Sequence, residues 1–475
     1  MTGYAEQLST RWLPLGMVGS AVLLGLVAGY DPKMALAAAF GLAFVAITLS
    51  NLTIGVCLFA VLTFLDEVLP SAGFSLTKLM GALLVVSWLA TITVGADRRR
   101  KVFESPAFLY VLLLFIAWVG VSATWADDSA AAIDAVTRYA PNILLFLIVY
   151  AAMRTRDDIF LVIGAFVVGT LISAAYGVVV PTDADDGSRL SGALGNANET
   201  AAALAVGLAL AVALALALRD KPWLRLGAVL GVPLCLLALF LTASRGGLVA
   251  LAAVLVAAVL MAGRLRAGAL ALAVVAVIGT VGYFAVVAPP EARDRIVQSD
   301  GGTGREDIWK VGWRMVEANA VAGVGAGNFA SQSVHYLLEP GVIMRPDFIV
   351  DDPKVAHNTY LEILAELGVI GLLLFLSILG YVLAAALKAV KAFARAGDRD
   401  MEIISRALVV ALAGLLTAAF FGSREFSNQL WLLLAFAPAL LGVARAELEQ
   451  RLGEEQLGED QLTPETPADA VHSAA

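Results

Sequence analysis

The sequence has few charged residues for its length. Asp, Glu, Lys and Arg make up 15% of the 475 residues, whereas 60% of the residues are hydrophobic. Soluble domains are about 25% charged and about half apolar even when glycine is counted. The composition therefore excludes an ordinary soluble enzyme and predicts a chain that is solvated by lipid.

Histidine and cysteine are also scarce. The three histidines are His335, His357 and His472, and no group of them with cysteine has the spacing of metal ligands. A metalloenzyme built on histidine is therefore excluded, and we expect neither a metal nor a cofactor. Cys57 and Cys235 each lie within an apolar run, where a thiol acts as a small hydrophobic side chain.

The excess of acidic over basic residues is confined to the end of the chain. The formal net charge is −8, but residues 447–475 hold eight acidic residues and only one basic residue. The other 32 acidic and 31 basic residues nearly cancel. We predict that 447–475 is a disordered acidic tail on the cytoplasmic side, and nucleic-acid binding has no support.

Apolar segments long enough to span a bilayer, which takes about 20 residues each, recur along the chain. The sequence predicts an all-α polytopic membrane protein with about fourteen (12–14) transmembrane helices. Eleven fall within 1–287 and three within 358–446, separated by a polar loop at 288–357. The predicted spans are 13–30, 33–49, 52–69, 77–95, 106–124, 138–153, 159–180, 200–218, 223–242, 246–262, 267–287, 358–385, 405–421 and 429–445.

Basic residues follow the even-numbered spans and predict the orientation. Cytoplasmic loops carry an excess of Lys and Arg, so both termini are expected in the cytoplasm and the loop 288–357 on the outer side. The loop after the second span is too short to contribute. The basic residues are Arg98, Arg99, Arg100, Lys101, Arg154, Arg156, Arg219, Lys221, Arg225, Arg264, Arg266, Lys388, Lys391, Arg395, Arg399, Arg445 and Arg451.

Within the outer loop, residues 304–318 predict an amphipathic helix lying over the membrane mouth. Thr303 and Glu306 have the spacing of a capping box. The following Ile308, Trp309, Trp313 and Val316 are expected on roughly one face.

The remaining polar groups gather at the outer ends of the spans, and no span has a charge near its centre. A coupled transporter is expected to place charges near the bilayer midplane. A site at the outer interface is therefore favoured, although a passive transporter of polysaccharide or small solutes remains the alternative of another class.

Two short stretches between apolar segments carry candidate site residues. In the stretch 189–198, Asn196 or Asn198 can cap the following helix, whose N-terminus would attract anions, and a plain cap is an equal alternative. Arg189 in that stretch can equally be merely solvated. In the tight turn 242–247, Arg245 is accompanied by Ser244 and two glycines, which favours a functional arginine over one that snorkels to lipid headgroups.

Two further stretches follow in the outer loop and at its end. Residues 304–309 place Arg305 on the first turn of the amphipathic helix, and a glycine-rich run follows at 323–329. At 357–371, His357 can titrate near neutral pH, and Glu362 and Glu366 lie four residues apart on one helix face. The sequence leaves open whether the two glutamates are functional or structural.

These stretches, in this order, resemble the O-antigen ligase and polymerase superfamily of bacterial envelope proteins. The matching elements are Ser-Arg-Gly, Gly-Arg-x-x-Ile-Trp, Gly-x-Gly-x-Gly-Asn-Phe, His-Asn-x-x-Leu with Glu-x-Gly-x-x-Gly, and Gly-Asn-x-Asn, at 244–246, 304–309, 323–329, 357–371 and 195–198. One departure is Ala320, where members often have proline.

The resemblance implies a class-C-like glycosyltransferase in the bacterial inner membrane. Its donor would be a glycan on undecaprenyl diphosphate at the periplasmic face, used without nucleotide sugar or metal. A ligase would transfer this glycan to lipid A core, whereas a polymerase would join lipid-linked repeat units of O-antigen or exopolysaccharide. The sequence favours the ligase only slightly.

The resemblance and the chemistry of a diphosphate leaving group together assign roles to the candidate residues. Arg245 and Arg305, followed by Arg189, are expected to hold the diphosphate, because the guanidinium fork binds phosphate oxygens bidentately. His357 is expected to orient or deprotonate the acceptor hydroxyl. The secondary candidates are Asn196, Asn198, Trp309, Asn358, Glu362 and Glu366.

Overall fold

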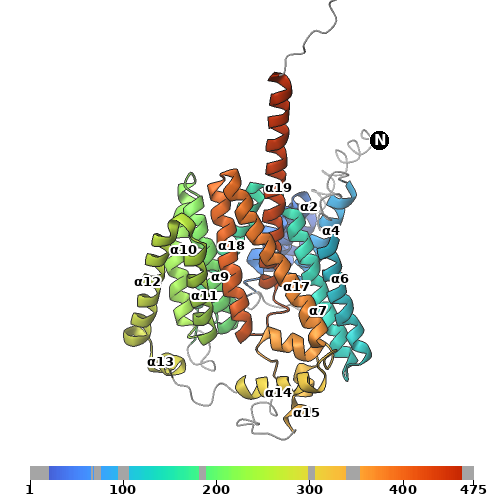
Figure 1. Ribbon diagram of the computed structural model, residues 1–475. Helices are drawn as coiled ribbons and strands as arrows, with labels where there is room; N and C mark the ends of the chain where they lie inside the picture. The colour runs from blue at the N-terminus through green and yellow to red at the C-terminus, as the bar shows by residue number, and fades with distance from the viewer. Residues whose placement is uncertain are drawn as a thin grey trace, which may run out of the picture.

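The chain folds into a bundle of helices in the computed structural model (Figure 1). The structure describes residues 21–65, 68, 76–94, 106–180, 189–297, 305–338 and 354–462, and no strand occurs among them. Its main helices are α2 (Pro32–Ser50), α3 (Leu52–Leu62), α4 (Leu76–Val94), α6 (Pro106–Val121), α7 (Ser129–Ala152), α8 (Arg156–Val179), α9 (Ala197–Ala217), α10 (Pro222–Leu241), α11 (Arg245–Met261), α12 (Arg266–Gly282), α13 (Pro290–Val297), α14 (Arg305–Ala318), α15 (Phe329–Leu337), α17 (Thr359–Ala396), α18 (Arg399–Ala418) and α19 (Asn428–Leu462).

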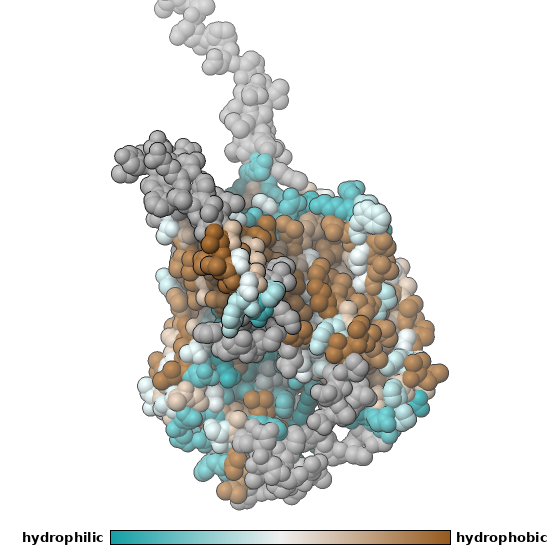
Figure 2. Space-filling model, turned by 180° about the vertical axis from the view of Figure 1, so that it is seen from behind, coloured by the Kyte–Doolittle hydropathy of each residue, from teal (hydrophilic) through white to brown (hydrophobic). Residues whose placement is uncertain are grey.

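The prediction of an all-α polytopic membrane protein is confirmed. Nine helices of the described residues are long and apolar enough to cross a membrane, and five more apolar helices are shorter. Each of the fourteen predicted spans overlaps one of these helices. Figure 2 shows an apolar band across the middle of one face, with hydrophilic residues above and below it. The number of actual crossings stays a prediction.

Helix α9 lies at the centre of the bundle. It is rich in alanine, and 83% of its apolar window is buried, against 6% for the window that contains α12. Small side chains let neighbouring helices approach closely, which is how helices associate without a hydrophobic driving force in lipid. Helix α12 stands at the edge of the bundle in Figure 1, as a helix that faces lipid does.

Several helices differ from the predicted spans, and α7 and α17 bear on the site. Helix α7 begins at Ser129 rather than 138, because the Asp128 side chain accepts the N–H groups of Ala130 and Ala131 at 3.0 Å each. Helix α17 continues to Ala396, where Gly397 ends it at φ 73°. It also contains a break at Gly368, which separates a short arm at 359–367 from the long apolar part.

The predicted disorder of 447–475 is wrong for its first part. Helix α19 continues without a break to Leu462, and residues 463–475 lie outside the described residues. The extension is helical because Glu, Gln, Leu and Arg are good helix formers and the first proline comes only at Pro464. It projects from the bundle at the top of Figure 1.

The large polar loop carries three helices at the other end of the bundle, which we call the site end. Helices α13, α14 and α15 lie there (Figure 1). The predicted amphipathic helix is confirmed as α14, with Ile308, Val311 and Met315 buried, whereas Thr303 of the predicted capping box lies outside the described residues. Trp313 was expected on the buried face but is 54% exposed. Five residues along an α-helix correspond to a rotation of about 500°, so Trp313 and Ile308 lie on different faces of α14.

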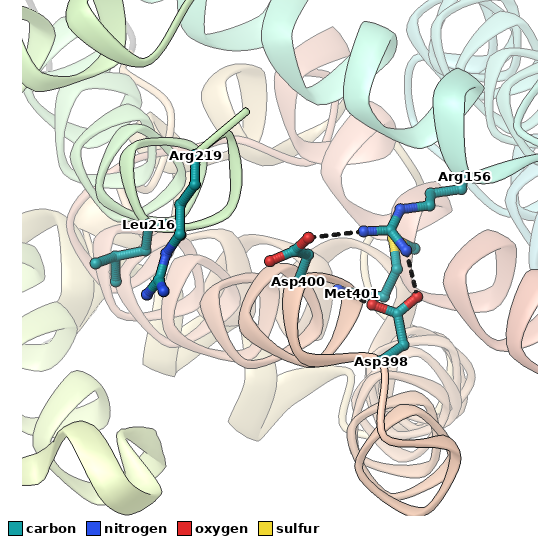
Figure 3. A network of polar contacts seen from close by, with 6 residues as sticks. All are labelled: Arg156, Leu216, Arg219, Asp398, Asp400 and Met401. Carbon is teal, nitrogen blue, oxygen red and sulfur yellow. Dashed lines mark hydrogen bonds and ion pairs between the residues drawn. The ribbon is translucent and has the colours of Figure 1, made fainter. Parts of the chain in front are cut away.

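An ion-pair network joins helices at the end opposite the site. Arg156 of α8 contacts Asp398 at 2.6 Å and Asp400 at 2.8 Å, both at the start of α18 (Figure 3). Arg156 and Arg219 belong to two of the basic loops that the sequence placed on one side of the membrane, and they appear together in this view. Residues of these two loops thus lie at the same end of the bundle.

Candidate active site

The break in α17 creates the framework of the site. Gly368 has φ 66°, and a Cβ atom there would lie 2.1 Å from the carbonyl oxygen of Val321. The glycine-rich run at 323–329 packs against the break: Val324 N–H donates to Ala365 O at 2.9 Å, and Gly325 N–H to Glu366 O at 2.8 Å. Carbonyl groups that the break would leave without partners are thereby satisfied.

Glu366 anchors the same glycine-rich run through its side chain. Its carboxylate accepts the backbone N–H of Gly327 at 2.8 Å and that of Phe329 at 3.0 Å. Gly325 has φ 101°, and a Cβ atom there would lie 2.4 Å from the Cβ of Ala126. Glu366 and the glycines therefore position the loop, which gives the weak glycine signal in the sequence a structural reason.

The turn before α11 is a second tightly held element. Ser244 caps α11 by accepting the N–H of Gly247 at 3.1 Å. Ala243 has φ 44°, a conformation that non-glycine residues rarely adopt, and such strain gathers at functional sites. Arg245 directly follows this turn and is exposed at the first position of α11.

Arg189 supports that turn from behind. Its side chain is buried and donates from Nε to the Thr242 carbonyl at 2.9 Å and from Nη2 to Asn198 Oδ1 at 3.2 Å. The same Asn198 oxygen accepts the hydroxyl of Ser244 at 2.8 Å. Through these contacts Arg189 holds the Arg245 turn in place, and its expected part in holding the diphosphate stays a prediction.

The two asparagines of 189–198 have distinct places. Asn196 is a helix cap, accepting the N–H groups of Asn198 at 2.9 Å and Glu199 at 3.1 Å. Asn198 instead joins Arg189 and Ser244 through its side chain. The cap interpretation thus holds for Asn196.

Arginines from three separate segments lie near one another at the site end. Arg245 donates from Nε to the backbone oxygen of Arg295 in α13 at 2.5 Å. The pKa of Arg305 lies below its ordinary value, first because of burial and then because of the positive charges of Arg245 and Arg295. Like charges held close together favour the binding of a multiply charged anion. Arg295 was not foreseen, because nothing in the sequence marks it among the bases of the outer loop.

His357 lies beside this cationic cluster. Burial, followed by the charges of Arg305 and Lys354, lowers the pKa of His357 to about 4. The imidazole is therefore neutral at physiological pH and can accept a proton. His357 is also the second non-glycine residue with positive φ, at 48°, among the described residues. The neighbouring Asn358 caps α17 by accepting Tyr360 N–H at 3.1 Å and Leu361 N–H at 3.2 Å.

The segment 422–425 between α18 and α19 also contacts these residues, and it was not among the predicted site residues. The Ser423 hydroxyl donates to the Glu362 carboxylate, and Arg424 donates from Nη2 to the Asn198 carbonyl at 2.8 Å. Burial raises the pKa of Glu425 to about 7. The signal that could have found this segment is the polar run 422–425 between two apolar spans.

The structure thus brings together most of the predicted residues. Arg245, Arg305 and His357 share one charged neighbourhood, while Arg189, Asn198 and Glu366 hold the segments that carry them. In the described part of the chain, no three His, Cys, Asp or Glu side chains are grouped so that they could hold a metal ion.

Comparison with known proteins relates part of the chain to a described family. No curated protein matches the chain. Residues 230–376 match the family model described as O-antigen ligase, and this segment includes Arg245, Arg305, His357 and the broken part of α17. Members of this family are glycosyltransferase-like enzymes. The resemblance seen in the motifs is thereby confirmed: the chain is a polytopic membrane protein, and its residues 230–376 are similar to the O-antigen ligase family.

Proposed function

We propose that this protein transfers a glycan from undecaprenyl diphosphate to an acceptor at the periplasmic face of the bacterial inner membrane. The observation that supports this most directly is the proximity of Arg245, Arg305 and the neutral His357 at the site end. The proposal keeps the predicted orientation, in which both termini are cytoplasmic and the site end faces the periplasm.

In the proposed reaction, an acceptor hydroxyl oxygen attacks the anomeric carbon of the donor glycan. The bond between this carbon and the diphosphate oxygen breaks, and its electron pair leaves with the diphosphate. Arg245 and Arg305, together with Arg295, would stabilise the charge that develops there. His357 would accept the hydroxyl proton. Neither a metal nor a nucleotide sugar is required in this scheme.

The site end also offers a place for the lipid part of the donor. An apolar groove of about 470 Å³ lies between α11 and α12, and its wall begins one turn beyond Arg245. A polyprenyl chain could lie in this groove while its diphosphate meets the arginines. The lining residues include Leu248, Leu251, Leu255, Leu270, Val277 and Val281.

The proposal is tested by transfer with the purified protein in detergent, where transport across a membrane cannot occur. The donor is an undecaprenyl-diphosphate-linked repeat unit, offered together with lipid A core as the acceptor. We expect a glycan-modified core from the wild type and little from Arg245→Ala, Arg305→Ala or His357→Ala. Near-normal transfer by Arg245→Ala at normal expression would contradict the assignment of the site.

The same reaction distinguishes the ligase from the polymerase. We propose the ligase, which extends lipid A core and leaves the donor repeat unit at its original length. Longer lipid-linked chains with unmodified core would instead identify a polymerase. No transfer to either acceptor, together with donor movement across vesicles, would identify a transporter.

A further inference from the structure

The backbone of Ala356, the residue before His357, is held from two sides. Ala356 is fully buried, and its carbonyl oxygen accepts the indole Nε1–H of Trp309 at 3.0 Å. The carboxyl group of Glu362 lies on the side of the Ala356 backbone N–H and interacts with it electrostatically. Side chains of two different helices thus act on the backbone of this one residue.

His357 needs such support because of its own conformation. At φ 48° a non-glycine residue is strained, and such a conformation persists only where the surroundings enforce it. The carbonyl that accepts the hydrogen bond from Trp309 belongs to the peptide bond between Ala356 and His357. On the other side of His357, the Asn358 side chain binds the first turn of α17.

The two holding side chains also connect His357 to the rest of the site. Trp309 is four residues after Arg305 on α14, so the two residues lie on the same side of that helix. Glu362 lies on the short arm of α17 and accepts the hydroxyl of Ser423 from the segment between α18 and α19. A shift of either side chain would change the place of His357 relative to Arg305.

We propose that Trp309 and Glu362 are positioning residues that hold the His357 imidazole against the arginine cluster through the Ala356 backbone. This assignment rests on the proposed function, in which His357 accepts the proton of the acceptor hydroxyl. It gives Glu362 a role distinct from that of Glu366, which anchors the glycine-rich loop instead.

The first test is kinetic and uses the purified full-length protein. Trp309→Phe removes the Nε1–H donor and keeps an aromatic ring, while Glu362→Ala removes the carboxyl group. We expect kcat to fall about tenfold to a hundredfold, as for a misplacement of the order of 1 Å, with the KM for the lipid-linked donor within about twofold. Glu362→Gln keeps a side-chain oxygen beside the Ala356 N–H and should retain most of the activity.

Matched variants show whether the effect passes through His357. Trp313→Phe alters an exposed tryptophan of the same helix and should leave kcat unchanged. In a His357→Ala background, Trp309→Phe should cause no further loss, because residues that act as one unit are not additive. Equal losses in both backgrounds would overturn the proposal.

A second measurement does not depend on transfer. Diethyl pyrocarbonate modifies neutral imidazole, so the rate of modification of His357, followed by mass spectrometry, reports its surroundings directly. We expect Trp309→Phe and Glu362→Ala each to change this rate at least twofold, while His335 on α15 keeps its own. Unchanged modification of His357 in both folded variants would refute the positioning role. Absence of transfer by the wild type, with the modification changed as expected, would refute the proposed function alone.

Discussion

Arg189 and Asn198 are joined by a hydrogen bond of 3.2 Å from the guanidinium Nη2 to the amide Oδ1. Asn198 Oδ1 also accepts a hydrogen bond from the Ser244 hydroxyl, and the backbone carbonyl of Asn198 accepts one from Arg424 Nη2. Asn198 therefore links three segments that are far apart in the sequence and supports the turn from which Arg245 emerges. A residue that the sequence marks as a helix cap or anion ligand instead serves as a junction.

Replacement of Asn198 by alanine should lower transfer at least tenfold. The substitution leaves the buried Arg189 and the Ser244 hydroxyl without a shared acceptor, and each buried unsatisfied group costs about 1–3 kcal/mol. The Arg245 turn would loosen as a result. The measurement is kcat with the folded protein quantified by size-exclusion chromatography.

The matched control is Asn196→Ala, two residues earlier. Asn196 caps α9, and the loss of such a cap costs about 0.5–2 kcal/mol of stability. We expect a lower unfolding temperature with unchanged activity per folded molecule. Equal specific activity of the two variants would show that Asn198 does not support the site.

Lysine should not substitute functionally for Arg245 or Arg305 at the proposed diphosphate site. Arg245→Lys and Arg305→Lys keep the charge but lose the planar fork, and a hydrogen bond to a charged group is worth about 1.5–3 kcal/mol. We expect kcat/KM for the donor to fall about ten- to a hundredfold in each variant. Arg219→Lys, at the opposite end of the bundle, should retain full activity, and wild-type activity of Arg305→Lys would argue against bidentate contact.

Much of the fold can be predicted because membrane spans depend on local hydrophobicity. Each predicted segment is an apolar run of its own, and lipid forces such runs to be helical. The break at Gly368 cannot be predicted in this way, since the apolar pattern continues through it. It depends on the backbone of Val321, which only the folded loop brings against Gly368.

The site was predictable to the extent that its residues lie in sequence motifs. Arg245, Arg305 and His357 were found because each is a charged or titratable residue in a short motif on the predicted outer side. Arg295 and Ser423 were not, because their roles arise only from tertiary contacts: one lends its backbone oxygen to Arg245, and the other binds Glu362.

Two glycines of α17 provide a stability test of the helix break. In Gly368→Ala, the new Cβ atom would lie 2.1 Å from the Val321 oxygen at a backbone φ of 66°. We expect a loss of at least about 2 kcal/mol in the free energy of unfolding, because both strain and a clash with backbone are introduced. Gly380→Ala meets nothing within 4 Å and should be as stable as the wild type or slightly more so. The measurement is thermal unfolding of the two variants in detergent. Equal unfolding temperatures for Gly368→Ala and Gly380→Ala would contradict the break at Gly368.

The pH dependence of transfer should differ between the free enzyme and the donor complex. His357 acts as a base only when it is neutral, so activity is lost as the pH falls through its pKa. In the free enzyme this pKa is about 4, because burial and the charges of Arg305 and Lys354 disfavour the imidazolium. The bound diphosphate opposes these charges and should raise the pKa by about one to three units. The acid limb of kcat should therefore lie at higher pH than that of kcat/KM for the donor.

Lys354→Met should move the acid limb of kcat/KM to higher pH, because one of the charges that disfavour the imidazolium is removed. Identical acid limbs for kcat and kcat/KM, both unaffected by Lys354→Met, would exclude His357 as the group that titrates.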